Sequence, residues 1–430
     1  MKNFKKHISL VIATIIGLNS FSALSTITEV SAAENDGEVI ELEYWYAYGG
    51  ASEVANLEMV NRFNELHDDI QVTATGQGSY FDMNTKVQTS FVSGNTPDLF
   101  IAQDTIVETF ALNQMIEPLS PLIERDNEEV QIDDFVPGLL GNSIVDDTYY
   151  GLPMFKSTPL LYVNKTMLDE AGIELSQLET WDGFSEAARQ LTTDEVTGVS
   201  NSLDVWLYES WVAQAGGSIL NEEDTEFAYN NEQGVAAFDF MRNLVNEGAW
   251  NAPSGSSSST SDQEFLSQKS GLFFYSTAAL SALLNSSEEV GFELEAIMLP
   301  RGEQQAVTTG GSNIVMSAGL DEATKEAAWT FLKFVTSTEQ NQYASQTTGY
   351  LPTRYSTTET AEYQALIEEQ PLYKVAFDQL EFAEARPMVP GYNEMGDMWV
   401  EEAEKLLNDE NISTQDGMNS AVERSNQILQ

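Results

Sequence analysis

The alternation of strand-like and helical segments after residue 38 restricts the chain to an α/β fold. Residues 39–45 mostly alternate apolar and acidic side chains, as a half-buried strand does. Apolar residues recur at helical spacing over 52–66, and strand-like runs follow at 70–74 and 99–101. Because strands separated by helices pair within one sheet, this order predicts α/β units around a largely parallel sheet.

Strand-like and helical segments continue to the end of the chain. We expect a strand at 160–163, a Ser-rich loop at 254–261, and helices at 181–191, 234–245, 322–335, 395–407 and 414–429. Trp329 and Trp399 lie on amphipathic helices and are expected in the core. A length of 430 residues exceeds one ordinary core and indicates two or three domains.

The first 33 residues have the pattern of a secretory signal peptide. A basic start with Lys2, Lys5 and Lys6 precedes an apolar run at 8–18 and a small-residue cleavage site at 30–32. The chain contains no cysteine, so it has neither disulfides nor a cysteine for lipid attachment. We therefore expect an exported, periplasmic or extracellular protein that is not lipid-anchored.

The formal net charge is −49. Removal of residues 1–33 takes away three Lys and one Glu, so the remainder carries −51. A field of this sign repels phosphate backbones, which makes nucleic acid an improbable partner.

Residues for catalysis or metal binding are scarce. His7 and His67 are the only histidines, and His67, beside two aspartates at a helix end, is interpreted as a surface residue. No nucleophile elbow, phosphate-binding loop or dinucleotide fingerprint occurs. These absences predict a non-enzyme without metal or cofactor. A glycosidase that uses two carboxylates stays open as an alternative, because acidic residues are abundant.

Aromatic residues collect where the first predicted strand ends. The run is Tyr44-Trp45-Tyr46-Ala47-Tyr48-Gly49-Gly50, and ligands of open α/β sheets bind beyond the carboxyl ends of the strands. Aromatic faces pack on the C–H faces of sugars, while small polar groups orient hydroxyls. Tyr48, and further along the chain Trp206, are therefore candidates for contact with a carbohydrate-like ligand.

Several short motifs, in their order and spacing, resemble those of extracellular solute-binding protein family 1, the carbohydrate-uptake receptors of ABC importers. They are Asn61-Arg62-Phe63-Asn64, Gly94-Asn95-Thr96-Pro97-Asp98, the segment Ser157–Lys165, Gly310-Gly311-Ser312-Asn313-Ile314-Val315-Met316 and Thr348–Arg354. The similarity runs from about residue 42 to 429. It is strongest to the glycerol-3-phosphate-binding branch, which shares Ala421-Val422-Glu423-Arg424-Ser425-Asn426-Gln427.

That resemblance implies a set of ligand-binding residues. The pocket tyrosine of the branch matches Tyr80, and its glutamate matches Asp104, a shorter carboxylate. The remaining matches are Ser157, then Ser276 or Thr277, Gly311 or its neighbour Gly310, and Tyr350.

One position departs from the branch. Where its phosphate-binding arginine would lie, residues 391–399 contain no basic residue and the match falls near Asp397. Two like charges about 4 Å apart repel by roughly 4 kcal/mol at an effective dielectric constant of about 20. Arg386 is near enough in sequence to substitute, but residues 386–392 look like those of sugar-binding relatives. We therefore favour a neutral polyhydroxy ligand over glycerol phosphate.

The resemblance implies a two-lobed, periplasmic-binding-protein-like α/β fold (type II) with the ligand cleft between the lobes. We predict one lobe from residues 36–154 plus 301–345, and the other from 155–300 plus 346–430, with crossings near 155, 300 and 346.

The predicted function is that of a monomeric receptor that binds a mono- or oligosaccharide or polyol and delivers it to an ABC permease. A receptor for glycerol 3-phosphate or a glycerophosphodiester is the first alternative. A sensory receptor subunit and a secreted glycan-degrading enzyme are the others.

Overall fold

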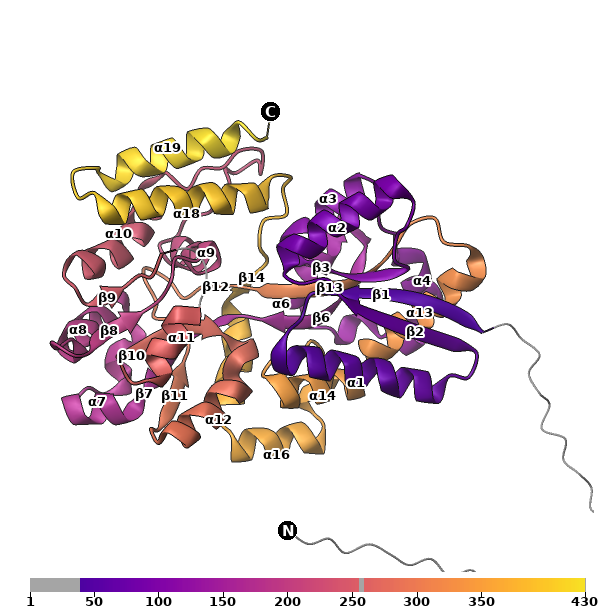
Figure 1. The fold of residues 1–430 in the computed structure, drawn as a ribbon, viewed down its shortest axis with the longest axis horizontal. Helices are drawn as coiled ribbons and strands as arrows, with labels where there is room; N and C mark the ends of the chain where they lie inside the picture. Colours follow the sequence, from indigo (N-terminus) through magenta and orange to yellow (C-terminus); the bar gives the residue numbers. More distant parts are fainter. Residues whose placement is uncertain (1–38, 255–258, 430) are drawn as a thin grey trace, which may run out of the picture. The chain divides into compact units, whose positions relative to one another are not determined.

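The computed structural model of the protein describes residues 39–254 and 259–429. Residues from Val39 onward form one compact unit that contains two five-stranded sheets (Figure 1). The predicted signal peptide at 1–33 lies outside the described residues.

The first sheet contains the strands near the N-terminal end and one late strand. Its order is β2 (Ile70–Gly76), β1 (Ile40–Tyr46), β3 (Leu99–Gln103), β13 (Gly310–Met316) and β6 (Gly151–Ser157). The pairs of β1 with β2 and with β3 are parallel, whereas β13 is antiparallel to both β3 and β6.

The second sheet contains the middle of the chain. Its order is β11 (Leu294–Ile297), β7 (Pro159–Asn164), β10 (Ser270–Ser276), β8 (Thr197–Ser200) and β9 (Trp250–Asn251). The pairs of β7 with β10 and β11 are antiparallel, and those of β8 with β9 and β10 are parallel. Two small ribbons, β4–β5 (Ile144–Val145 and Thr148–Tyr149) and β12–β14 (Val307–Thr308 and Ala383–Glu384), complete the strands of the described residues.

The expectation of a largely parallel sheet is therefore wrong, since both sheets are mixed. The physical reason lies in the connections. After β6 the chain needs only Thr158 before it enters β7 in the other sheet, so no helix returns it to a parallel position. β13 likewise enters the first sheet from the second, and its direction opposes that of β3.

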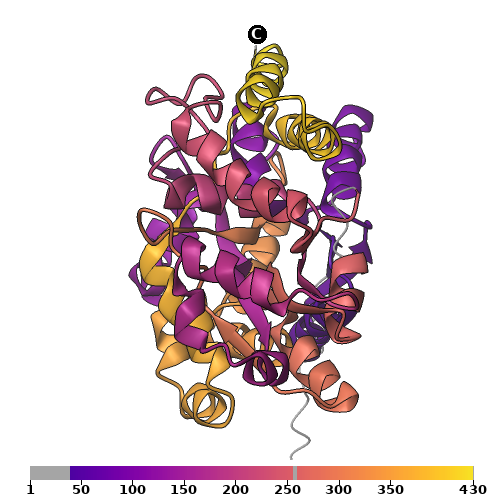
Figure 2. The ribbon, with the colours of Figure 1, turned by 90° about the vertical axis from the view of Figure 1, so that its left-hand side faces the viewer.

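Helices flank both sheets. They are α1 (Gly50–Leu66), α2 (Tyr80–Ser93), α3 (Val107–Leu112), α4 (Ser120–Arg125), α5 (Asn127–Val130), α6 (Pro137–Leu140), α7 (Lys165–Ala171), α8 (Trp181–Leu191), α9 (Val205–Gln214), α10 (Glu232–Asn246), α11 (Ser259–Leu266), α12 (Leu280–Val290), α13 (Glu322–Val335), α14 (Thr338–Thr348), α15 (Tyr355–Thr358), α16 (Ala361–Glu369), α17 (Leu372–Asp378), α18 (Tyr392–Asn408) and α19 (Thr414–Asn426). Figure 1 shows α1 on one side of the first sheet and α2 and α3 on the other. The helices α18 and α19 lie side by side in both views (Figures 1 and 2).

Local sequence signals account for several helix boundaries. The bounds of α8 and α13 are those expected from the apolar periodicity, and Asp321 caps α13 by accepting hydrogen bonds from the amides of Ala323 and Thr324. A reciprocal capping box between Ser79 and Asp82 begins α2. The predicted loop at 254–261 is wrong at its end, where α11 begins at Ser259, and residues 255–258 lie outside the described part.

The apolar cores follow the two sheets. One cluster buries the first sheet against α1 and α13, and two further clusters cover opposite faces of the second sheet. Trp329 and Trp399 are 0% and 1% exposed, which confirms their expected place in the core. Within the described residues, no helix combines the length and the apolarity that crossing a bilayer requires.

Candidate ligand-binding site

Three aromatic rings lie in series at the carboxyl end of β1. Tyr48 follows this strand, and its ring centroid is 4.6 Å from that of Phe155, which in turn stacks on Tyr350 at 4.9 Å. The Tyr48 hydroxyl and the Ser312 hydroxyl are hydrogen-bonded at 2.7 Å. Burial raises the pKa of Tyr350 to about 12 and that of Tyr48 well above its usual value. These neutral rings form an aromatic wall to which the segment after β1, strand β6 and the segment after α14 each contribute one ring.

Two polar atoms beside this wall are buried and have no hydrogen-bond partner among the described residues. One is the hydroxyl of Tyr80, at the start of α2, and the other is Oδ2 of Asp104, directly after β3. Burial, followed by the nearby Tyr350, raises the pKa of Tyr80 well above its usual value; the Ser312 hydroxyl opposes this rise, and Asp104 adds a smaller increase. A buried polar atom without a hydrogen bond costs about 1–3 kcal/mol. Such atoms are therefore expected where a ligand supplies the missing partner.

The carboxylate of Asp104 is held in position by two neighbours. Lys156 on β6 forms an ion pair with Oδ1, and the side-chain amide of Asn313 donates to the same oxygen at 3.2 Å. Asp104, Lys156 and Asn313 are all fully buried. Burial lowers the pKa of Lys156, and the carboxylate of Asp104 opposes that effect. The pair is close to neutral overall and leaves Oδ2 free to accept a hydrogen bond.

The glycine pair of β13 brings backbone and an indole ring close together. Gly311 pairs with Lys156 and has φ of +111°, and a Cβ there would lie 2.0 Å from the Phe155 carbonyl oxygen. Gly310 pairs with Ser157 and lies directly against the Trp206 ring. The Trp206 Nε1 donates to the carbonyl oxygens of Thr309 and Thr308 at 2.9 and 3.2 Å, so this indole is fixed by its polar edge.

Two cavities lie next to these residues, one beside Trp206 and one beside Tyr80, and Asp204 lines both. The smaller, about 40 Å³, is also lined by Trp206 and Ser276. The larger, about 450 Å³, extends from Tyr80 to Asp397 on α18. Ser276 is half-buried and caps the turn after β10, whereas its neighbour Thr277 is fully buried. Asp397 is exposed at the outer end of the larger cavity.

The structure therefore brings Tyr48, Tyr80, Asp104, Gly311 and Tyr350 into one neighbourhood. Ser157 and Trp206 adjoin it through Gly310, and Ser276 and Asp397 line the two cavities that meet at Asp204. Their part in ligand binding stays a prediction.

Arg386 is not available as a free phosphate ligand. Its guanidinium donates to both carboxylate oxygens of Glu209 at 2.6 and 2.8 Å, and the Tyr392 hydroxyl donates to the same carboxylate. Burial lowers the pKa of Arg386, but Glu209, Tyr392 and Asp204 together raise it above its usual value, so the group stays charged and paired. The pair joins α9 to the segment that precedes α18.

Sequence reasoning missed Lys156, Asn313 and Asp204. A lysine inside an otherwise apolar strand signals a buried cation that needs a carboxylate, so Lys156 was recognisable in principle. Asn313 belongs to the motif that follows Gly311. Asp204 caps α9, where its side chain accepts from the Trp206 amide at 2.9 Å, and short Asp caps of this kind are common.

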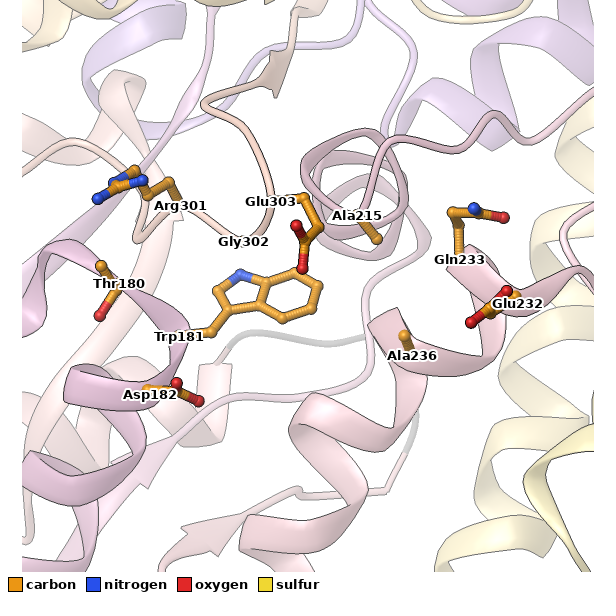
Figure 3. Close-up of a pocket in the computed structure, with 10 residues that line it drawn as sticks. All are labelled: Thr180, Trp181, Asp182, Ala215, Glu232, Gln233, Ala236, Arg301, Gly302 and Glu303. Carbon is orange, nitrogen blue, oxygen red and sulfur yellow. The ribbon is translucent and has the colours of Figure 1, made fainter.

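A separate hollow, of about 550 Å³, surrounds the indole of Trp181, the first residue of α8 (Figure 3). Its rim carries Asp182, Glu232, Glu303 and Arg301 (Figure 3), and these charged residues are exposed. The Trp181 Nε1 donates to Gln214 at 2.8 Å. Among the described residues, none that line this hollow has a buried side-chain polar atom without a partner. The hollow therefore lacks buried unpartnered atoms of the kind found at Tyr80 and Asp104.

His67 lies at the end of the first long helix, α1. Its ring stacks on Phe63 at 4.2 Å. Within residues 39–254 and 259–429, no group of three or more His, Cys, Asp or Glu side chains could hold a metal ion.

Comparisons with known proteins agree with this architecture. Residues 58–370 match the model of the family described as bacterial extracellular solute-binding protein. The chain is 24% identical over 361 residues to the sn-glycerol-3-phosphate-binding periplasmic protein UgpB of Rhizobium meliloti, covering 81% of this chain and 83% of that protein.

Two solved structures show the same two-lobed fold. UgpB from Mycobacterium tuberculosis in complex with glycerophosphocholine superposes with a TM-score of 0.80 at 25% identity, covering 90% of this chain and 98% of that one. An ABC substrate-binding protein from Listeria monocytogenes in complex with cycloalternan gives 0.79 at 24% identity, covering 91% and 99%. The family model spans well over half of the sequence. The chain belongs to the bacterial extracellular solute-binding proteins.

Proposed function

We propose that the protein is a solute-binding receptor of an ABC importer, and that its ligand is a carbohydrate or polyol bound in the cleft beside Tyr80 and Asp104. The observation that carries the proposal is the pair of buried, unpartnered atoms, Tyr80 Oη and Asp104 Oδ2, next to an aromatic wall. A ligand hydroxyl donates to the carboxylate and accepts from the phenol, while its C–H face packs on the rings. No covalent step is required of the receptor.

A ligand without phosphate fits the charges of the cleft better than glycerol 3-phosphate does. Arg386 is paired with Glu209, and Asp397 occupies the region where the glycerol-3-phosphate-binding branch has an arginine. A phosphate near Asp397 would therefore meet repulsion of the order of kilocalories per mole. The named ligands of the relatives include glycerol 3-phosphate, glycerophosphocholine and the oligosaccharide cycloalternan, so both classes belong in the test.

The receptor works as a clamp in this proposal. One lobe consists of residues 36–154 and 301–345, and the other of 155–300 and 346–430. Tyr80 and Asp104 then belong to one lobe, and Ser276 and Tyr350 to the other. A ligand that contacts both lobes stabilises the closed form by its difference in affinity for the two states, and the closed form docks on the permease. The Thr105 hydroxyl, which donates to Asn393 at 3.0 Å, joins the proposed lobes directly.

Export and free diffusion complete the proposal. The signal pattern at 1–33 supports a receptor that acts outside the cytoplasmic membrane, and the sequence offers no cysteine for lipid attachment.

Titration calorimetry tests the ligand class. The panel contains glucose, maltose, a cyclic oligosaccharide, glycerol, glycerol 3-phosphate and glycerophosphocholine. We expect sub-millimolar binding of at least one sugar or polyol without phosphate, and no release of reducing ends from glycans. Binding of the phosphate compounds alone would overturn the neutral ligand, and release of reducing ends would overturn the non-catalytic role.

A further inference from the structure

Asn142, in the short turn after α6, links the proposed ligand-binding carboxylate to a distant segment of the chain. Its backbone carbonyl oxygen accepts from the side-chain amide of Asn313 at 3.1 Å, and the same amide donates to Asp104 Oδ1 at 3.2 Å. The Asn142 side chain donates to the carbonyl oxygen of Arg386 at 2.8 Å and accepts from the amide of Arg386 at 3.2 Å. One side chain therefore pairs with both backbone groups of Arg386, as a neighbouring strand would.

The bonds of Asn142 are shielded from water. Asn142 is 1% exposed and Arg386 is 8% exposed, so a bond lost between them leaves buried polar groups. The two segments also approach closely at the preceding residues, because a Cβ on Gly141 would lie 2.7 Å from that of Ala385. Any larger residue at position 141 would therefore push the segments apart.

Asn142 thereby holds residues 385–393, which lead from β14 into α18 and which we call the strap. The guanidinium of Arg386 and the hydroxyl of Tyr392, both in the strap, donate to the Glu209 carboxylate on α9. Side chains of α9 and α18 belong to the core cluster of the second sheet, whereas Asn313 lies on β13 of the first sheet. The strap is therefore packed with the second sheet, and Asn142 ties it to the first.

The strap has a second attachment beside the proposed ligand site. Thr105, the residue after Asp104, donates a hydrogen bond from its hydroxyl to the side-chain oxygen of Asn393 at 3.0 Å. Pro387 and Pro390 each fix one backbone dihedral angle between the two attachments and so stiffen the strap. A stiff segment that is held at both ends transmits a displacement from one end to the other.

We infer that Asn142 is a positioning residue, which couples Asp104 to the closing of the clamp through the strap. While Asn142 is bonded to Arg386, the strap and α18 stay against the first sheet and the cleft is closed. Loss of these bonds frees the strap and lowers the fraction of the protein in the closed form. The apparent affinity for any ligand falls in proportion to that fraction. The inference rests on the proposed function, since it concerns the closing of the same cleft.

Pulsed electron paramagnetic resonance on the full mature protein, without added ligand, tests the coupling. Because the chain has no cysteine, nitroxide labels can be placed at Gln88→Cys on α2 and Glu423→Cys on α19, both exposed positions. We expect Asn142→Ala to add a longer distance between the labels, because α19 packs on α18 and moves away from α2 with it.

A steric variant produces the same separation without removing a hydrogen-bonding group. Gly141→Ala brings a Cβ too close to that of Ala385, and Ala385 is exposed, so the strap gives way and the core stays intact. Gly138→Ala is the matched control, because its Cβ would lie 3.5 Å from that of Ala383, which is an ordinary contact. We expect the longer distance in Gly141→Ala and its absence in Gly138→Ala.

Calorimetry with chemically unlike probes separates a positioning role from a direct contact with ligand. Maltose, a cyclic oligosaccharide and glycerophosphocholine are titrated into the unaltered protein and into Asn142→Ala. Every probe that the unaltered protein binds is expected to lose affinity by the same factor, roughly tenfold for two hydrogen bonds. A residue that touched the ligand would instead discriminate among the probes.

Unchanged label distances in both Asn142→Ala and Gly141→Ala, or a loss of affinity confined to one of several bound probes, overturn the inference. If Asn142→Ala fails to fold, Gly141→Ala decides, since it keeps every hydrogen-bonding group. Failure of the unaltered protein to bind any probe counts against the proposed function, whereas the label distances still decide the role of Asn142.

Discussion

The cleft beside Tyr80 and the hollow around Trp181 differ in what their polar groups lack. The hollow has a volume of about 550 Å³, against about 450 Å³ for the cavity that Tyr80 lines, and it carries an aromatic ring and a rim of charges. Its charged groups face water, and the Trp181 Nε1 already has a partner. The cleft instead contains Tyr80 Oη and Asp104 Oδ2 without partners. The two regions therefore differ in their unsatisfied buried groups, and this difference is the reason to place the proposed ligand beside Tyr80 and Asp104.

The largest expected difference between the two regions is in stability. Lys156→Met leaves Asp104 as a buried, unpaired charge and lowers the free energy of unfolding by about 3–5 kcal/mol. Arg301→Met on the rim of the hollow changes it by less than about 0.5 kcal/mol, because Arg301 is exposed. Urea unfolding of both variants measures the difference. Equal stability of the two variants would contradict this prediction, because it would mean that Lys156 is not needed to compensate the buried charge of Asp104.

Removal of one stacked ring from each region separates packing from binding. Tyr350 stacks on Phe155 with centroids 4.9 Å apart, and Trp181 stacks on Phe240 at 4.7 Å. Tyr350→Ala is expected to weaken ligand binding by about 100-fold, as the loss of a central aromatic contact does, while the protein remains folded. Trp181→Ala loses a similar intramolecular stack and keeps full affinity. Unchanged affinity of Tyr350→Ala would remove this residue from the site.

A single hydroxyl tests the unpartnered group itself. Tyr80→Phe removes a buried atom that has no hydrogen bond, so the ligand-free protein keeps its stability or gains about 1 kcal/mol. The same change lowers ligand affinity by about tenfold, since the ligand hydroxyl loses its donor. Calorimetry and thermal unfolding of one preparation give both values. A variant that is less stable and binds equally well would mean that the hydroxyl serves the fold.

The smallest expected effect concerns the contact between α18 and the turn after β3. In the proposed clamp the hydrogen bond from Thr105 to Asn393 joins the two lobes in the closed form, so Thr105→Val is expected to shift the protein toward the open form. A neutral hydrogen bond contributes about 0.5–1.5 kcal/mol, so affinity falls by about threefold to tenfold. Thr330→Val, which removes a hydrogen bond within α13, is the control. An increase in affinity for Thr105→Val would place the contact in the open form instead.

Periodicity in the sequence predicted the helices better than the sheets. The apolar spacing gave the bounds of α8 and α13, whereas the antiparallel direction of β13 depends on how the chain crosses between sheets. No local pattern reports such a crossing, because the partner strands lie more than 150 residues apart.

The charge pairs of the cleft were harder to predict than its aromatic residues. Tyr48 follows a predicted strand, Tyr350 belongs to one of the family's motifs, and Tyr80 matches the pocket tyrosine of the glycerol-3-phosphate-binding branch. Arg386, in contrast, is paired with Glu209, which lies 177 residues earlier in the chain, and this pairing decides whether a phosphate finds a free cation. Asp204 looks in sequence like any helix cap. Partners of this kind are set by tertiary contacts, so residue type alone could not identify them.

The most direct test of the ligand site is a crystal structure of the protein with the compound that binds most tightly in calorimetry. The prediction is a ligand hydroxyl within 2.5–3.2 Å of both Asp104 Oδ2 and Tyr80 Oη, roughly the range of ordinary hydrogen bonds, with its C–H face near Tyr350. A ligand seated against Trp181, or one in the cleft that leaves both atoms unpartnered, would contradict the assignment.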